Sequence, residues 1–213
     1  MSKAPTRLPL FPLGGAILFP RSHLPLHVFE PRYRQMVEDA VAGDGKIGMI
    51  QPRAEPDDGL GQPELYRVGC IGEIVGLEEL GDGRYNVVLQ GTTRFRLIAE
   101  ADVGTPYRQA DVVPSGEDEA EPDALASILR AAVEQEARLL GDAMGLTVDW
   151  HAVERLDDEM LVNAISQVAP FDPGAKQALL ECAVLAERAQ LLIQLMQFLR
   201  AAHGGGDLSP RLQ

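Results

Sequence analysis

The sequence is poor in the residues that bind metals or form disulfides, with two cysteines and four histidines among 213 residues. Cys70 and Cys182 stand far apart, and neither lies in a Cys-x-x-Cys motif or a Cys/His cluster, so a disulfide framework and a zinc site are both unexpected. His23 and His27 are four residues apart. Pro25 between them favours an extended backbone, in which the two imidazoles would lie about 13 Å apart. The sequence therefore predicts no metal site and no cofactor.

Long apolar runs are also lacking. No segment approaches the roughly 18 apolar residues that a membrane-spanning helix needs. The N-terminal residues do not contain the continuous apolar stretch of a signal peptide. We therefore expect a cytoplasmic protein without a membrane segment.

Motifs for phosphate binding and catalysis are missing as well. The Gly-Lys pair at residues 45–46 suggests a phosphate loop, but that loop would need Gly at position 40 and Ser or Thr at position 47, where the chain has Ala40 and Ile47. There is no G-x-S-x-G motif, and neither cysteine has an activating context. The acidic pairs at 57–58, 78–79 and 157–158 fall in or beside predicted turns, where solvated carboxylates are usual. No enzymatic activity is expected.

Basic residues are scarce relative to acidic ones, and the net charge is −13. Residues 1–112 carry 12 basic and 15 acidic groups (net −3), whereas residues 113–213 carry 7 and 17 (net −10). An acidic surface repels phosphate, and the Arg and Lys residues are spread along the chain. Nucleic acid is therefore disfavoured as the main partner.

The first half of the chain consists of short apolar runs separated by Gly and Pro, which is typical of β-strands. Pro25 favours an edge strand, Pro31 favours the start of a helix that reaches Ala40, and Asp82-Gly83 favours a tight hairpin. We predict a small mixed β barrel with one short helix. Its strands are expected at residues 8–13, 24–29, 46–50, 66–75, 84–91, 93–98 and 107–113.

The second half has a helical period. The acidic residues 114–121 form a connector, and helices are predicted at 122–140, at 157–168 with Asp157 as N-cap, and from Asp172 through Leu199 as one continuous helix. In the second helix, one apolar face is expected to comprise Met160, Leu161, Ala164, Ile165 and Val168. The predicted fold is therefore α+β, with a β domain at 1–113, a connector at 114–121, a helical bundle at 122–203 and a flexible tail at 204–213.

The strongest candidate site is the strand-to-helix junction formed by Phe29, Glu30, Arg32 and Tyr33, because aromatic and charged residues at such junctions often serve binding. Arg94 and Phe95 would join it if their strand lies alongside. The alternative is that Phe29 and Tyr33 belong to the core and that Glu30 pairs with Arg32 or Arg94. If the site binds polypeptide, an extended segment would add to the edge strand, with aromatic and arginine side chains as anchors.

The order and spacing of several segments are informative together. They are residues 8–13 (LPLFPL), 17–20 (ILFP), 24–33 (LPLHVFEPRY), 65–74 (LYRVGCIGEI), 82–95 (DGRYNVVLQGTTRF) and the helical region 160–199. These segments resemble the N-terminal substrate-binding domain of Lon proteases, including its G-x-x-G/A strand and its DG…V-x-G-x-x-R hairpin. Residues 27–33 are more similar to the short free-standing members of this family than to the protease.

The resemblance implies a PUA-like β barrel followed by a helical bundle, and a module that binds unfolded or extended polypeptide without catalysis. It implies a role in protein quality control as an adaptor or holdase, with a protease or chaperone as a further partner. Two other functions stay open: RNA binding, because PUA-like barrels often bind RNA, and a small hydrolase with an unrecognised site. The natural ligand and the oligomeric state do not follow from the sequence.

Overall fold

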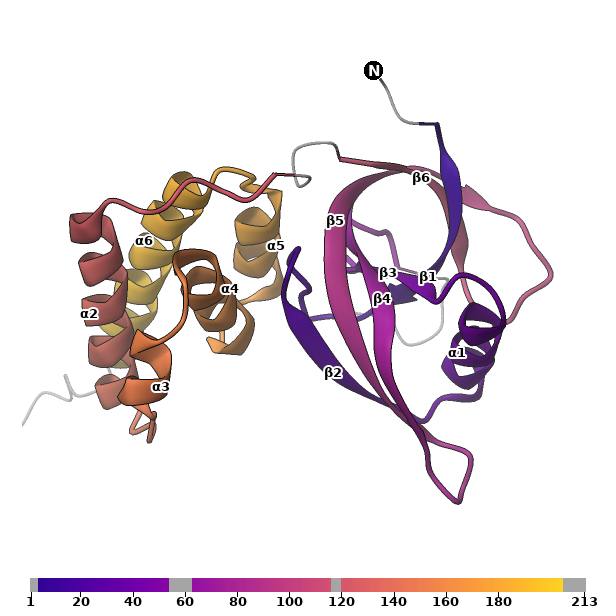
Figure 1. The fold of residues 1–213 in the computed structure, drawn as a ribbon, viewed down its shortest axis with the longest axis horizontal. Helices are drawn as coiled ribbons and strands as arrows, with labels where there is room; N and C mark the ends of the chain where they lie inside the picture. Colours follow the sequence, from indigo (N-terminus) through magenta and orange to yellow (C-terminus); the bar gives the residue numbers. More distant parts are fainter. Residues whose placement is uncertain (1–3, 54–62, 116–119, 205–213) are drawn as a thin grey trace, which may run out of the picture. The chain divides into compact units, whose positions relative to one another are not determined.

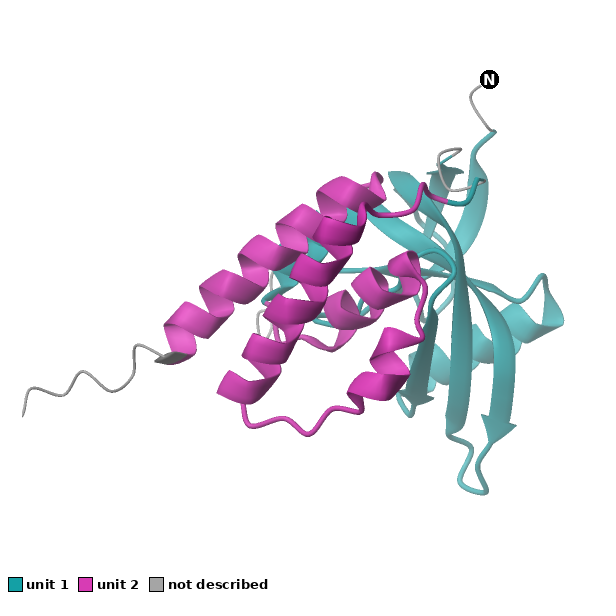
Figure 2. Cartoon of the chain, turned by 60° about the vertical axis from the view of Figure 1, so that its left-hand side comes forward, with its two compact units in different colours: residues 1–121, 172–181 teal, residues 122–171, 182–213 magenta. Residues whose placement is uncertain are grey.

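The computed structural model describes residues 4–53, 63–115 and 120–204. Most of the predicted 52–64 loop, the 114–121 connector and the 204–213 tail lies outside the described residues. The chain divides into two compact units, which we call the β unit (Met1–Glu121 with Asp172–Glu181) and the helical unit (Pro122–Phe171 with Cys182–Gln213) (Figures 1 and 2). The predicted division into separately folding domains stays a prediction.

The β unit contains a six-stranded mixed sheet with the order β2-β5-β4-β3-β1-β6, in which β6 also pairs with β5. The pairings therefore run from β5 through β4, β3, β1 and β6 back to β5, with β2 attached to β5 as an edge strand. Only β1 and β3 pair in parallel among these strands. The strands are β1 (Thr6–Pro12), β2 (His23–Val28), β3 (Lys46–Ile50), β4 (Val68–Glu79), β5 (Tyr85–Ala101) and β6 (Gln109–Pro114).

Alternating apolar residues of these strands form the core of the β unit. Leu8 and Leu10 of β1 point inward and join Phe95 and Leu97 of β5. The Phe95 ring takes the space above Gly69, where a Cβ atom would overlap the ring. The short apolar runs of the first half thus form strands, as predicted.

The hairpin predicted at Asp82-Gly83 is confirmed. It joins β4 to β5, and Gly83 adopts a positive φ of 78° that favours glycine. The prediction of separate strands at 84–91 and 93–98 is wrong, because both segments lie in β5. Thr92 is the extra residue of a β-bulge opposite Ile71 and Gly72, so the strand bends there and the ladder continues beyond it.

One helix of the β unit, α1 (Pro31–Ala42), follows β2 and begins on proline as predicted. Tyr33, Met36, Val37 and Ala40 form its buried face. Tyr107 fixes the helix further, since its hydroxyl donates a 2.6 Å hydrogen bond to Asp39.

The predicted continuous helix from Asp172 to Leu199 is wrong. Asp172 does cap a helix, by accepting from the backbone N–H of Ala175 at 2.8 Å, but this helix, α5 (Pro173–Glu181), ends before Cys182. A new helix, α6 (Leu185–Gly204), starts three residues later. Moreover, α5 groups with the β unit and α6 with the helical unit, although the sequence placed both in one bundle.

Polar side chains attach α5 to the strands. Gln51 donates to the Pro173 carbonyl at 3.1 Å, and Gln177 donates to the Val68 carbonyl at 3.0 Å. Lys176 donates to the Gly15 carbonyl at 2.8 Å, and the burial of its side chain lowers the pKa of its ammonium group.

The helical unit consists of α2 (Ser127–Ala143), α3 (Trp150–Glu154), α4 (Asp158–Val168) and α6. Asp157 caps α4 as predicted. Helix α3 was not predicted, because five residues are too few to show a helical period. The α+β class, with helices after a mixed β barrel, is confirmed.

The predicted apolar face of α4 is wrong in part. Met160 and Val168 are exposed, whereas the polar residues Asn163 and Ser166 are buried. The reason is a buried arginine on α6, Arg188, whose guanidinium donates a 2.5 Å hydrogen bond to the Asn163 side chain. A polar partner therefore turns a polar stripe of α4 inward.

Candidate functional site

The predicted junction lies where β2 ends and α1 begins. Phe29 is 60% exposed there, so it does not belong to the core. The next residue, Glu30, has extended backbone and is the N-cap position of α1. Its carboxylate accepts from Arg32, with a distance of 2.9 Å to Nε, and both side chains are about half exposed. The junction thus presents an aromatic ring beside a surface ion pair.

Tyr33 supports this surface from beneath. Its ring is buried and packs against Phe11 with 4.3 Å between centroids. The Arg32 guanidinium lies 4.5 Å from the Tyr33 centroid on the same ring. Burial of Tyr33 raises the pKa of its phenol, an effect that the nearby Arg32 charge partly offsets. Tyr33 is therefore a core residue that positions Arg32, as the alternative interpretation expected, whereas Phe29 is not.

Strand β2 is an edge strand, as predicted from Pro25, because it ends the strand order and pairs only with β5 among the described strands. The pairing with β5 is continuous from His23 to Val28, and the other edge of β2 has no partner among the described strands. Gly91 donates to the Ser22 carbonyl at 2.8 Å. Bonded and non-bonded pairs alternate in an antiparallel ladder, so Pro25 and His27 have backbone groups that face away from β5.

Pro25 has no N–H. On the outer edge of β2, Pro25 therefore offers only a carbonyl acceptor, whereas His27 offers both an acceptor and an N–H donor. This edge can therefore form only some of the backbone hydrogen bonds that would join it to an added strand. The side chains of the junction would have to supply the remaining affinity for an extended ligand.

A polar row crosses the outer face of the sheet next to the junction. The amide of Asn86 links the His27 ring at 2.9 Å to the Glu78 carboxylate at 2.8 Å. Arg84 lies 3.1 Å from the other ring nitrogen of His27. The His27 ring is 6.2 Å from the ring of Phe29, so the row adjoins the exposed aromatic. These partners were not predicted, although the hairpin register around Gly83 would have placed Asn86 opposite Glu78.

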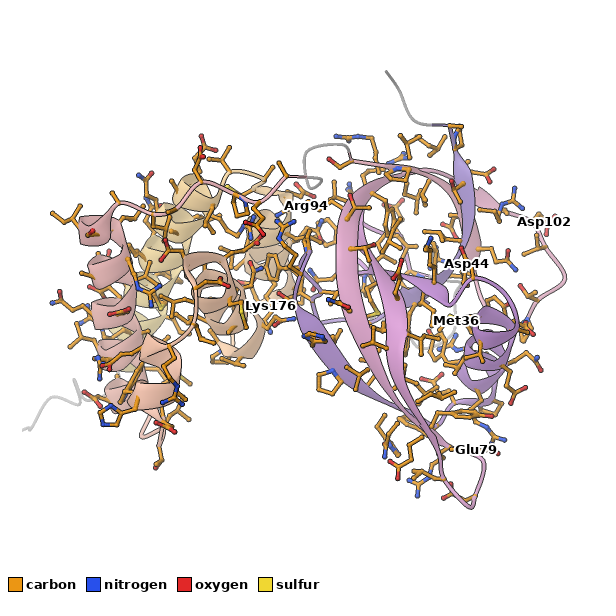
Figure 3. All side chains as sticks on the ribbon, viewed as in Figure 1. Met36, Asp44, Glu79, Arg94, Asp102 and Lys176 are labelled. Atoms are coloured by element: carbon orange, nitrogen blue, oxygen red, sulfur yellow. The ribbon has the colours of Figure 1, made fainter. Side chains whose placement is uncertain are left out.

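Arg94 and Phe95 do not lie at the junction. Val28 pairs with Tyr85 at the hairpin end of β5, and Arg94 is nine residues further along the strand, up to about 30 Å away if extended. Figure 3 shows Arg94 and Glu79 toward opposite ends of the strands. Phe95 is 1% exposed, and Arg94 is buried and donates to the Leu180 carbonyl of α5 at 2.6 Å. Both residues support the fold of the β unit.

Within residues 4–53, 63–115 and 120–204, no group of three or more His, Cys, Asp and Glu side chains is arranged to hold a metal ion. No helix in those ranges has the length and apolar character needed to cross a bilayer. The junction presents an exposed aromatic ring, an arginine held by an ion pair and the edge of a strand.

Comparison with known sequences points to one family. The family model of the ATP-dependent protease La (LON) substrate-binding domain matches residues 7–197. Lon protease 2 of Myxococcus xanthus is 29% identical over 197 residues, which cover 90% of this chain and 24% of that protein. Lon protease of Anaeromyxobacter dehalogenans is 28% identical, with 90% and 23% covered. The chain therefore spans about a quarter of the length of these curated relatives.

Solved structures show the same fold. The N-terminal domain of the Mycobacterium avium complex Lon protease aligns with a TM-score of 0.64 and 20% identity, over 90% of this chain and 98% of that one. A Lon N-terminal domain protein from Xanthomonas campestris aligns with a TM-score of 0.61 and 23% identity, over 89% and 98%. Since the family model covers most of the sequence, the chain belongs to the family of ATP-dependent protease La (LON) substrate-binding domains.

Proposed function

We propose that this chain binds unfolded or extended polypeptide without catalysing a reaction, and that it acts in the cytoplasm as an adaptor or holdase in protein quality control. The family supports polypeptide as the ligand, because the matching model describes a substrate-binding domain. A protease or chaperone is the partner that such an adaptor would serve. The proteolytic activity of the longer relatives is not part of this proposal.

The observation that carries the proposed site is the exposure of Phe29 beside a fixed arginine. An exposed ring can bury a large area against a ligand, and Arg32, positioned by Glu30 and the Tyr33 ring, can bond to carbonyl or carboxylate oxygens. Because Arg32 is already positioned, little side-chain entropy is lost when a ligand binds. The binding surface therefore comprises Phe29, Glu30 and Arg32, with the edge of β2 beside them.

The test measures binding of a fluorescein-labelled model protein that is reduced and alkylated so that it stays unfolded. Phe29→Ala and Arg32→Ala should each weaken binding by about 1–2 kcal/mol, which is about 5- to 30-fold in Kd. Fluorescence anisotropy gives the Kd, and thermal melting shows whether each variant is folded.

The helical unit offers matched controls. Phe198 is 76% exposed on α6, and Arg138 pairs with Glu154 at 2.7 Å while it lies 4.6 Å from the Trp150 ring, as Arg32 does with Glu30 and Tyr33. Phe198→Ala and Arg138→Ala should leave binding unchanged. Equal binding by wild type and stable junction variants would place the site elsewhere, and failure to bind any unfolded substrate would refute the function.

RNA binding and hydrolysis are separate proposals that simple assays decide. Retention of RNA on a filter at low salt would favour RNA as ligand, despite the net charge of −13.

A further inference from the structure

A second candidate binding site lies at the other end of β5. It is a pocket of about 440 Å³, within the range of about 300–1,000 Å³ that is usual for ligand sites. Its lining residues are Arg53, Glu64, Leu65, Arg67, Leu97, Ile98, Ala99 and Glu100. All of them belong to the β unit, and none belongs to the junction.

The backbone explains why a pocket forms here. Leu97 pairs with Val112 and Ala99 pairs with Asp111, so Ile98 is the extra residue of a β-bulge between β5 and β6. A bulge bends its strand and leaves the extra residue outside the register of the ladder. Ile98 is about half exposed, has no Cα partner in β6 and is one of the residues that line the pocket.

Two arginines come from segments that the backbone fixes. The N–H of Arg53 donates to the Glu64 carbonyl at 2.7 Å, and the carbonyl of Arg67 accepts from the Leu97 N–H at 2.8 Å. The Arg53 guanidinium also lies 5.5 Å from the Tyr66 centroid. Neither guanidinium has an ion-pair partner among the residues that the structure describes.

Among the lining residues that the structure describes, the acidic groups do not cancel this charge. Arg108 binds the Glu100 carboxylate through two nitrogens, at 2.5 and 2.7 Å, so Glu100 is already neutralised. Glu64 leaves one negative charge against the two of Arg53 and Arg67. Most of the lining is polar, and its apolar part includes Leu65, Leu97 and the half-exposed Ile98.

We infer that this pocket binds the C-terminal carboxylate of a polypeptide whose last side chain is aliphatic. Guanidinium groups bind carboxylates through paired charge-assisted hydrogen bonds, and Ile98, which is about half exposed, offers an apolar surface for the aliphatic side chain. The bulged backbone at Ile98 can bond to the peptide backbone, which a simple carboxylic acid lacks. The inference rests on the proposed polypeptide binding but concerns a separate site.

The test uses the full chain and a labelled hexapeptide that ends in leucine with a free carboxylate. The free acid should bind at least about tenfold more tightly than the same peptide with a C-terminal amide, since the amide removes the charge that the arginines recognise. Arg53→Gln and Arg67→Gln should each abolish this preference. The matched control is Arg96→Gln, because Arg96 is an exposed arginine of β5 that does not line the pocket.

Four results would overturn the inference. The first is equal binding of the acid and the amide, and the second is a loss of the acid preference in the Arg96 variant that equals the loss in the Arg67 variant. The third is tight binding of an amidated peptide with an internal glutamate, and the fourth is equally tight binding of N-acetyl-leucine. The Phe29→Ala variant separates this site from the junction, because it should weaken capture of unfolded protein and keep the preference for a free carboxylate. Capture of unfolded protein without that preference would sink the pocket alone.

Discussion

Arg188 provides the sharpest test of how the helical unit is stabilised. It is the largest fully buried side chain of the described residues, at 1% exposure. Its guanidinium donates to the Asn163 side chain at 2.5 Å and to the carbonyls of Cys182 at 3.0 Å and Ala183 at 3.2 Å. The Glu159 carboxylate lies 3.9 Å away. Arg188 thus connects α4, α6 and the break between α5 and α6.

Replacing Arg188 with methionine would keep most of the aliphatic volume and remove the charge and every donor. A buried acceptor left without its donor costs about 1–3 kcal/mol, and removing one partner of a buried charged network costs about 3–5 kcal/mol. Cys182 is only half-buried, so water can replace the donor to its carbonyl. Asn163 and Glu159 are buried, so water cannot replace the guanidinium beside them in the same way. We expect a loss of about 3–5 kcal/mol in the free energy of unfolding.

Thermal and urea unfolding followed by circular dichroism would measure this loss. For a chain of this length the expected decrease in Tm is about 6–20 °C. Arg138→Met is the control, because Arg138 forms an exposed ion pair with Glu154, which should contribute about 0–1 kcal/mol. The double variant Arg188→Met with Asn163→Leu should recover part of the stability, since it replaces the buried acceptor of the lost Arg188 hydrogen bond with an apolar side chain. A Tm within about 2 °C of wild type for Arg188→Met, or strictly additive losses in the double variant, would refute the reasoning.

Three further predictions address the β unit and the core. Gly91→Ala should destabilise the protein strongly because the new Cβ would overlap the Phe19 carbonyl, whereas Gly104→Ala has open space; thermal melts compare the two. Leu192→Asp should unfold the helical unit at a cost of several kcal/mol, because the new carboxylate would be buried. Ile128→Asp, at an exposed site in the first turn of α2, should leave the stability nearly unchanged, and urea titrations compare the two variants. Burial and the bond to Asp39 raise the pKa of Tyr107 to about 12 from 10. The neutral phenol is thus favoured in the folded state. The stability that Tyr107 contributes is fully present below pH 10 and is lost as the pH rises through 12. Tyr107→Phe should remove this loss, as unfolding measured from pH 9 to 12.5 would show.

Local patterns were sufficient to predict most of the β unit. Period-two alternation marks its strands, Pro31 marks the start of α1 and Asp82-Gly83 marks the hairpin, because each signal acts within a few residues. The bulge at Thr92 could not be predicted in this way. It depends on the register between β4 and β5, which is a property of two strands that no single segment contains.

The candidate site was predicted in part for the same reason. The residues from Phe29 to Tyr33 are neighbours in sequence, so their proximity follows directly. Their burial does not follow, because Phe29 and Tyr33 are both aromatic and only the packing of Phe11 against Tyr33 distinguishes them. Arginine is usually found at the surface, and only the hydrogen bond of Arg94 to the α5 backbone shows that it is buried.

Helix α5 shows most clearly why a helical period does not identify a packing partner. Its sequence predicts a helix, but two of its four buried residues, Lys176 and Gln177, are polar and would be assigned to the solvent side. They are buried because carbonyls of Gly15 and Val68 accept from them, and those carbonyls belong to segments more than 100 positions away in sequence. The carbonyls at the end of α5 are likewise bonded by arginines, Leu180 by Arg94 and Cys182 by Arg188, in place of the next turn of helix. Arginine side chains thus satisfy carbonyls beside the break after Glu181. A fragment that ends at Glu121 would lack a helix on which the buried polar groups of the β unit depend.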